Sequence, residues 1–150
     1  MNNGYWSFVE PYFRQVRTSA EPKEFVASFG RIPRPNGLLL AAYWCDYEVR
    51  NGGFLQFFTN PTGVLAPEAL AAFEAIERQD LATLVRRTMA YFGNQYPRSQ
   101  DSRIATISLR RCAYCGQPSP FANEDLAFYA CLEHEPFKAA ADRYAAQVST

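Results

Sequence analysis

The sequence predicts an all-α protein, a single compact multi-helix domain of about six to eight helices. Three observations lead to this fold class. Apolar residues recur with the three- and four-residue spacing of amphipathic helices along most of the chain. Glycine and proline interrupt that spacing where short helices would start or end. The chain has 150 residues without a shift in composition between its halves, so we expect one domain over residues 1–150.

Two short helices are expected at the N-terminus. The first covers residues 5–17, where Pro11 marks either its start or a kink. Its apolar residues recur at helical spacing and are Trp6, Val9, Phe13 and Val16. Pro22 is expected to begin the second helix and Gly30 to end it, because proline suits the first helical turn and glycine the position after the last.

A central helix is expected over residues 38–50, after a loop at residues 31–37 that is rich in proline and glycine. Apolar residues cover most of the circumference of this helix. A helix that is apolar nearly all round is buried on most sides. We therefore expect it in the middle of the fold.

Five further helices are expected in the rest of the chain, with polar or proline-containing loops at residues 94–101 and 112–120. Asp80 is the expected N-cap of one helix, and Pro136 predicts a break at Glu135 because proline disfavours helical geometry in the residue before it. Gly93 is expected to close the helix that contains the clearest apolar stripe. The five helices are expected to start at Pro67 and to cover residues 81–92, 102–111, 124–132 (capped by Asn123) and 136–147.

The most informative segment is the one we call the aromatic corner, residues 48–63. Asn51, Gly52 and Gly53 resemble a helix C-cap, where the chain needs a positive φ that glycine adopts without strain. The three phenylalanines that follow are spaced to share one side of a short helix. We expect Gly52 or Gly53 to have a positive φ, and we expect burial of Phe54, Phe57 and Phe58.

The corner also resembles a known signature, that of the DNA-mimic-protein-like domain family, over about residues 38–65. The residues that carry the resemblance are Glu48, Asn51, Gly52, Gly53, Phe54, Gln56, Phe57, Phe58, Asn60 and Gly63. This family consists of small, mostly helical bacterial proteins, largely of unknown function. One member is similar to double-stranded DNA in surface charge, forms a dimer and occupies a DNA-binding regulator. The resemblance implies an all-α fold and a non-enzymatic protein-binding or regulatory module that binds an unknown protein partner and forms a homodimer.

The charge balance argues against DNA mimicry by this chain. Lys and Arg together number 15, as do Asp and Glu, so the formal net charge is zero. A DNA mimic needs rows of carboxylates in excess, and a nucleic-acid-binding protein needs an excess of basic residues. We therefore expect a mixed surface and no direct binding to nucleic acid.

The sequence shows neither a membrane span nor a signal peptide. No segment reaches the roughly 18 apolar residues of a span, and the N-terminus lacks a basic region followed by an apolar one. These observations predict a cytoplasmic protein that does not bind membranes. Its four cysteines are then expected to be thiols or metal ligands rather than disulfides.

The spacing of cysteine and histidine near the C-terminus suggests a zinc site. Cys112 and Cys115 form one pair, and Cys131 and His134 form a second pair fifteen residues later. Zinc prefers four nitrogen or sulfur ligands in a tetrahedron, and a closed set of four would be structural. Two alternatives stay open: buried or surface residues with no ligand, and a redox dithiol at Cys112 and Cys115.

Catalytic constellations are not evident. Asp46 and Glu48 lie two residues apart on a helix, so their carboxylates point to different faces and form no dyad. Glu48 is expected to bind backbone or arginine groups of the turn at residues 51–53, in a structural role. The chain has one histidine and no nucleophile elbow or phosphate loop. An enzyme of unknown type is therefore the third hypothesis, after the binding module and the zinc-stabilised structural domain.

Overall fold

The computed structural model describes residues 4–110 and 119–150, which form eight α-helices and three 3₁₀ helices without a strand. The all-α fold class is thereby confirmed for the described residues. The α-helices are α1 (Trp6–Val9), α2 (Pro22–Phe29), α3 (Arg34–Thr59), α4 (Ala66–Ala75), α5 (Gln79–Met89), α6 (Gln100–Arg110), α7 (Ala122–His134) and α8 (Phe137–Val148). The 3₁₀ helices are η1 (Glu10–Tyr12), η2 (Pro61–Leu65) and η3 (Ala90–Phe92).

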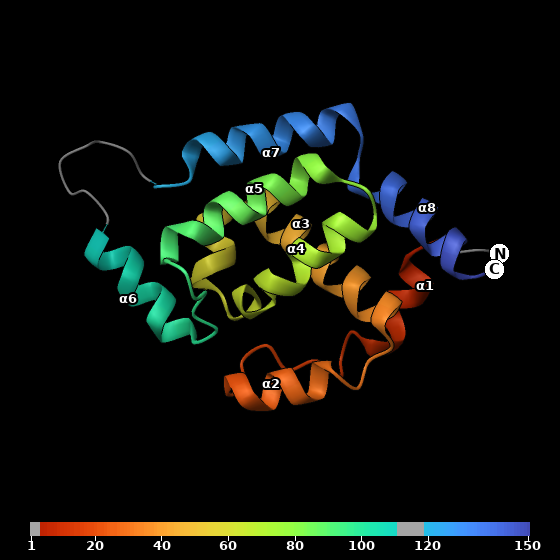
Figure 1. Ribbon diagram of the computed structural model, residues 1–150, viewed down its shortest axis with the longest axis horizontal. Helices are drawn as coiled ribbons and strands as arrows, with labels where there is room; N and C mark the ends of the chain where they lie inside the picture. Colours follow the sequence, from red (N-terminus) through yellow and green to blue (C-terminus); the bar gives the residue numbers. More distant parts are fainter. Residues whose placement is uncertain (1–3, 111–118) are drawn as a thin grey trace.

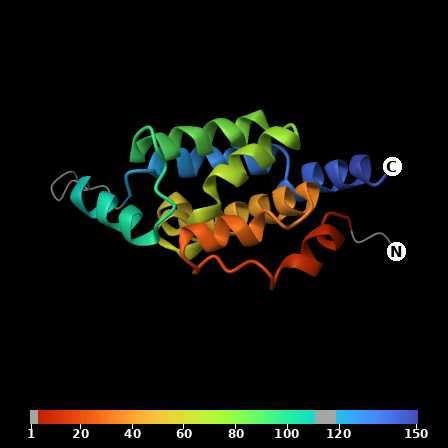
Figure 2. The same ribbon diagram turned by 60° about the horizontal axis from the view of Figure 1, so that its bottom comes forward.

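Helix α3 is the centre of the fold, as its apolar circumference predicts. It packs against α1, α4, α6, α7 and α8, and fourteen of its residues are buried. Helices α4 and α5 lie over it, α7 runs along one long edge and α2 along the other (Figure 1). Helices α1 and α8 share one end of the molecule, and α6 lies at the opposite end (Figures 1 and 2).

Two N-terminal predictions need correction. The expected helix at residues 5–17 ends at Val9, and a 3₁₀ turn follows because Pro11 cannot donate a helical hydrogen bond. The expected loop at residues 31–37 is also wrong in its second half, since α3 begins at Arg34. Pro35 is compatible with this start because it lies in the first turn, where no backbone N–H donor is needed.

The predicted caps of α5 and α7 are also wrong, although both helices are present. Arg78 is the N-cap of α5 and Phe121 that of α7, so each helix begins before the expected cap residue. The Asp80 carboxylate instead accepts two hydrogen bonds from the Arg78 guanidinium, at 3.0 and 2.9 Å. The predicted stops at Gly93 (φ +98°) and at Glu135, which is extended before Pro136, are confirmed.

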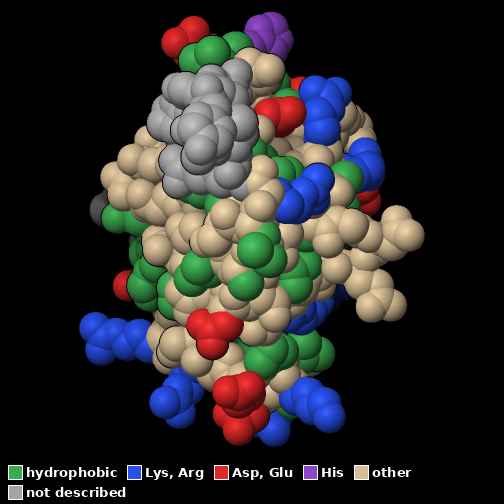
Figure 3. All heavy atoms as spheres, turned by 90° about the vertical axis from the view of Figure 1, so that its left-hand side faces the viewer, with side chains coloured by type: hydrophobic (Ala, Val, Ile, Leu, Met, Phe, Trp, Pro, Cys, Tyr) green, Lys and Arg blue, Asp and Glu red, His purple; other side chains and the backbone are tan. Residues whose placement is uncertain are grey.

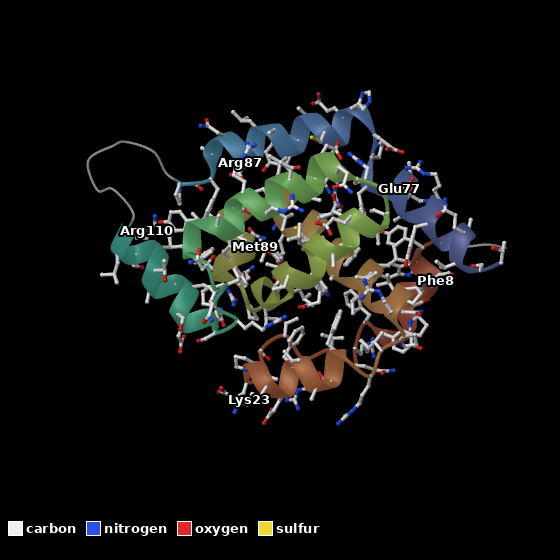
Figure 4. The ribbon with its side chains drawn as sticks, viewed as in Figure 1. Phe8, Lys23, Glu77, Arg87, Met89 and Arg110 are labelled. Carbon is white, nitrogen blue, oxygen red and sulfur yellow. The ribbon has the colours of Figure 1, made fainter. Side chains whose placement is uncertain are left out.

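A Schellman-like turn joins α4 to α5 without the usual glycine. Glu77 has a φ of +62° and lies at the turn between these helices (Figure 4). The Arg78 N–H donates to the Phe73 carbonyl at 2.8 Å, which is the long hydrogen bond of that motif. Glu77 therefore occupies a left-handed conformation that costs a residue with a side chain about 1–2 kcal/mol.

Candidate functional site

The aromatic corner is a kink within α3 at which two helical segments meet, as the predicted glycine stop and following short helix require. Gly53 has a φ of +75° and a ψ of −179°, and Gly52 is also non-helical. The prediction of a positive φ at one of the two glycines is thus confirmed for Gly53. Phe54, Phe57 and Phe58 are completely buried, as predicted, and Phe54 and Phe58 stack with ring centroids 5.9 Å apart.

Helix α7 holds this kink from both sides. Phe54 N donates to Asp125 Oδ1 at 2.8 Å, so Asp125 satisfies a backbone donor that the kink leaves without a helical acceptor. On the other side, the Tyr129 hydroxyl donates to the Val49 carbonyl at 2.9 Å. Burial raises the pKa of Asp125, while its hydrogen bond from Phe54 opposes that shift.

Glu48 is surrounded by amide and hydroxyl donors that the kink brings back toward it. Oε2 accepts from Gln56 Nε2 at 2.8 Å and from Asn60 Nδ2 at 3.0 Å, and Oε1 accepts from Thr62 Oγ1 at 3.0 Å. The expectation that Glu48 binds backbone or arginine groups at residues 51–53 is therefore wrong. Four polar residues of the corner instead form a closed network, which we call the Glu48 cluster.

The Glu48 cluster explains why glycine stands at position 52. A Cβ atom there would lie 2.0 Å from Gln56 Oε1, the amide that reaches across the kink to Glu48. Asn51 remains exposed and has no hydrogen bond through its side chain among the described residues. The signature residues near Glu48 thus contact one another within the chain.

Arg103 of α6 is a completely buried cation that the sequence reasoning missed. Its Nε and Nη2 donate to the carbonyls of Phe58 (2.8 Å) and Asn60 (3.0 Å), at the C-terminal end of α3. Its Nη1 donates to the Arg98 carbonyl at 2.6 Å. The carbonyl end of a helix carries partial negative charge, which stabilises the guanidinium. Burial nevertheless lowers the pKa of Arg103.

Gly63 is the signature residue that makes room for this arginine. A Cβ atom at position 63 would lie 2.9 Å from Arg103 Nε and 2.6 Å from the Phe57 carbonyl oxygen. Arg103 and Ile107 lie one turn apart and face the core together, whereas Leu109 is exposed. That i, i+4 relationship with a buried residue is the one sequence signal that could have identified Arg103.

Asp46 and Glu48 bind separate partners. Asp46 Oδ2 accepts from Arg50 Nε at 2.9 Å on the next helical turn, and the Glu48 carboxylate lies in the cluster described above. Asp46 is 3% exposed. Burial is the main reason that the pKa of Asp46 is raised, and the Arg50 guanidinium opposes this effect.

The expected zinc ligands are divided between the described and the undescribed parts of the chain. Cys112 and Cys115 lie outside the described residues. Cys131 and His134 lie one turn apart near the end of α7. Burial and the neighbouring Asp80 carboxylate raise the pKa of Cys131. Within residues 4–110 and 119–150, His, Cys, Asp and Glu form no group of three or more that could hold a metal ion. The zinc site stays a prediction.

No helix in the described part of the chain has the length and apolar character required to cross a bilayer.

Comparison with known proteins identifies the family. The sequence profile of the DMP19-like protein family matches residues 30–148, which include the corner, α3 and every later helix. No curated protein and no solved structure matches the chain. The family identified by the profile differs from the DNA-mimic-protein-like domain family named in the sequence analysis, which is thereby corrected. The two names are related, because DMP19 stands for DNA mimic protein 19. The chain belongs to the DMP19-like protein family.

Proposed function

We propose that this protein is a non-enzymatic protein-binding module with a regulatory role, which acts in the cytoplasm and forms a homodimer. The observation that carries the proposal is the exposure of large aliphatic side chains on α6 and the beginning of α7. Leu109 is 86% and Leu126 is 69% exposed. Exposed aliphatic side chains contribute to interaction surfaces where they gather into one contiguous patch.

The surface charges support binding through packing rather than through DNA mimicry. Several carboxylates have an arginine partner, as in Arg98–Glu68 at 2.7 Å and Arg143–Glu135 at 2.7 Å. Figure 3 views the end of the molecule at α6 and shows acidic and basic side chains interspersed on that face. Neutralised carboxylates do not form the uninterrupted negative rows that attract a DNA-binding protein.

The Glu48 cluster supports a structural role for the family signature. Both Glu48 oxygens accept hydrogen bonds from side chains of the same chain, and Glu48 is 5% exposed. A carboxylate bound in this way holds the chain after the kink against the helix before it. The signature would then provide the scaffold on which a partner-specific surface is presented.

The test uses Leu109→Arg and Leu126→Arg, with Val148→Arg as the matched control. Val148 is also an exposed aliphatic residue, at 38%, but it lies at the end of α8, at the opposite end of the molecule (Figure 1). We expect affinity capture from the source cytoplasm to recover a protein with the wild type and the control, and not with the two leucine variants.

Light scattering after size-exclusion chromatography of the wild type and the three variants tests whether the protein forms a homodimer. We expect a dimer mass for the wild type and for Val148→Arg. A monomer at every concentration would contradict the dimer, and identical capture by all four proteins would contradict the surface.

A zinc-stabilised structural domain is the second candidate. The observation that favours it is the position of Cys131 and His134 on successive turns of α7, where both side chains can reach one metal ion. Cys112 and Cys115 would supply the other two ligands. Elemental analysis of protein prepared without chelator tests this candidate: one zinc per chain is expected, and less than about a tenth of an equivalent would exclude a site of this affinity class.

A further inference from the structure

Asp46 is a buried acid with one oxygen that has no hydrogen-bond donor among residues 4–110 and 119–150. Arg50 occupies Oδ2, with Nε at 2.9 Å and Nη2 at 2.8 Å. Oδ1 is buried and has no hydrogen-bond partner in the described part of the chain. Most buried polar atoms in folded proteins are paired, so an exception requires a physical explanation, of which an absent ligand is one.

Asp46 also lines a cleft of about 420 Å³, which we call the α3–α8 cleft. Its lining residues come from the start of α1, the middle of α3 and the junction of α7 with α8; helices α1 and α8 share one end of the molecule (Figures 1 and 2). Pockets that bind small molecules have volumes of about 300–1,000 Å³. The cleft is therefore large enough for a small organic ligand.

Cations and apolar groups complete the lining. Arg50 and Lys138 contribute positive charge, their side chains are 55% and 71% exposed, and each has a carboxylate partner: Asp46 for Arg50 and Asp142 for Lys138. Helix α8 begins at the cleft, so its positive N-terminal end lies at the same wall. The apolar wall contains Leu132, Phe137 and the ring of Tyr5, whose centroid is 5.3 Å from that of Phe137.

We propose that the α3–α8 cleft binds a free α-amino acid with an apolar side chain. Once Arg50 has moved aside, the α-ammonium group donates to the uncovered Asp46 carboxylate and supplies the donor that Oδ1 lacks. The α-carboxylate binds Arg50 and Lys138, close to the start of α8. The apolar side chain packs against Leu132 and Phe137.

Arg50 is the residue that must move. Its exposed side chain turns away from Asp46 as the ligand enters, and the zwitterion then lies between the two residues, with each of its charges beside the opposite charge. The Asp46 carboxylate would repel a ligand that carries only a negative charge, and Arg50 and Lys138 would repel a ligand that carries only a positive charge. The arrangement therefore selects a molecule that carries both charges on neighbouring atoms.

Isothermal titration calorimetry of the full chain tests the proposal, with L-phenylalanine, L-leucine and L-methionine as the probes. We expect saturable binding of at least one of them. The matched analogues are 3-phenylpropanoate, which lacks the ammonium group, and 2-phenylethylamine, which lacks the carboxylate. Each should bind at least about tenfold more weakly, because it leaves a charged group of the cleft unpaired.

Three variants assign the binding to the cleft. Arg50→Gln and Asp46→Asn should each weaken binding at least about tenfold through the lost charge-assisted hydrogen bond. Arg86→Gln is the matched control, since Arg86 on α5 is equally exposed, at 56%, and pairs with Glu74 away from the cleft. Circular dichroism establishes that each variant is folded, and Arg50→Gln, at an exposed position, keeps the test valid if Asp46→Asn unfolds.

Three results would overturn the proposal. One is the absence of binding for all three amino acids at millimolar concentration. Another is equal affinity for an amino acid and for either matched analogue. The third is an unchanged affinity in Arg50→Gln.

Discussion

Asp125 on α7 accepts a hydrogen bond at 2.8 Å from the backbone N–H of Phe54, a residue 71 positions earlier in the chain. The same carboxylate lies where a side chain at Gly53 would have to be, since a Cβ atom there would be 2.5 Å from Asp125 Oδ2. One contact therefore fixes both the kink of α3 and the identity of the residue at the kink.

Asp125→Ala is expected to lower the free energy of unfolding by about 1–2 kcal/mol, because it removes the acceptor of a helix-start N–H. Urea unfolding followed by circular dichroism measures the change. Glu133→Ala, at an exposed site on the same helix, is the control and should differ little from the wild type. Equal stability of the two variants would show that α7 does not hold the kink through Asp125.

Gly53→Ala is expected to destabilise the protein by a few kcal/mol, because backbone strain and the clash with Asp125 act together. Gly93→Ala separates the two effects. Gly93 also has a positive φ, of +98°, but no atom lies within 4 Å of a Cβ built there. Thermal denaturation should place Gly93→Ala between the wild type and Gly53→Ala, and the reverse order would contradict this explanation.

Arg103→Met is expected to lower the free energy of unfolding by about 3–5 kcal/mol, since the carbonyls that Arg103 now binds would be buried without donors. Arg103→Lys should also destabilise, because an ammonium group cannot reproduce the fork of the guanidinium. Arg87→Met is the control: Arg87 is exposed on α5 and labelled in Figure 4. Urea denaturation of all three variants and the wild type measures the change. If Arg103→Met and Arg103→Lys unfold at the same urea concentration as the wild type, the role of Arg103 is refuted.

Glu77→Gly is expected to stabilise the protein by up to about 1 kcal/mol, because glycine adopts the left-handed conformation of this turn without steric strain. The gain is reduced by the greater freedom of glycine in the unfolded chain. Differential scanning calorimetry should show a higher midpoint temperature. Glu77→Ala, which keeps the strain, should not show that increase.

The pH dependence of stability should reflect Asp46. Burial raises its pKa in the folded state, so folding favours the protonated carboxyl. The stability that this preference contributes is complete below the pKa of Asp46 in the unfolded chain. It is lost as the pH rises through the pKa of Asp46 in the folded protein. The melting temperature of the wild type, relative to that of Asp46→Asn, should fall as the pH increases through this range. A difference that is constant with pH would contradict the assignment.

The sequence by itself determined the features that depend on local backbone geometry. Gly52 or Gly53 was expected to need a positive φ, Gly93 and Pro136 were expected to end helices, and apolar spacing predicted the central helix and the buried phenylalanines. These features depend on backbone geometry and on the spacing of residues close together in the sequence, both of which can be read from the order of amino acids. The helix starts at Asp80 and Asn123 were misplaced because an N-cap depends on which side chain finally reaches the free N–H groups.

The tertiary structure alone decided which polar groups meet. Glu48 binds Thr62, Asp125 binds Phe54, and Arg103 binds the end of α3. Each contact joins segments whose distance in space depends on the angle of the kink and on how the helices pack around α3. Spacing along the chain records the face of a helix on which a side chain lies, but not the neighbour that it meets there. The partners of buried charges therefore emerge only when the whole core is assembled.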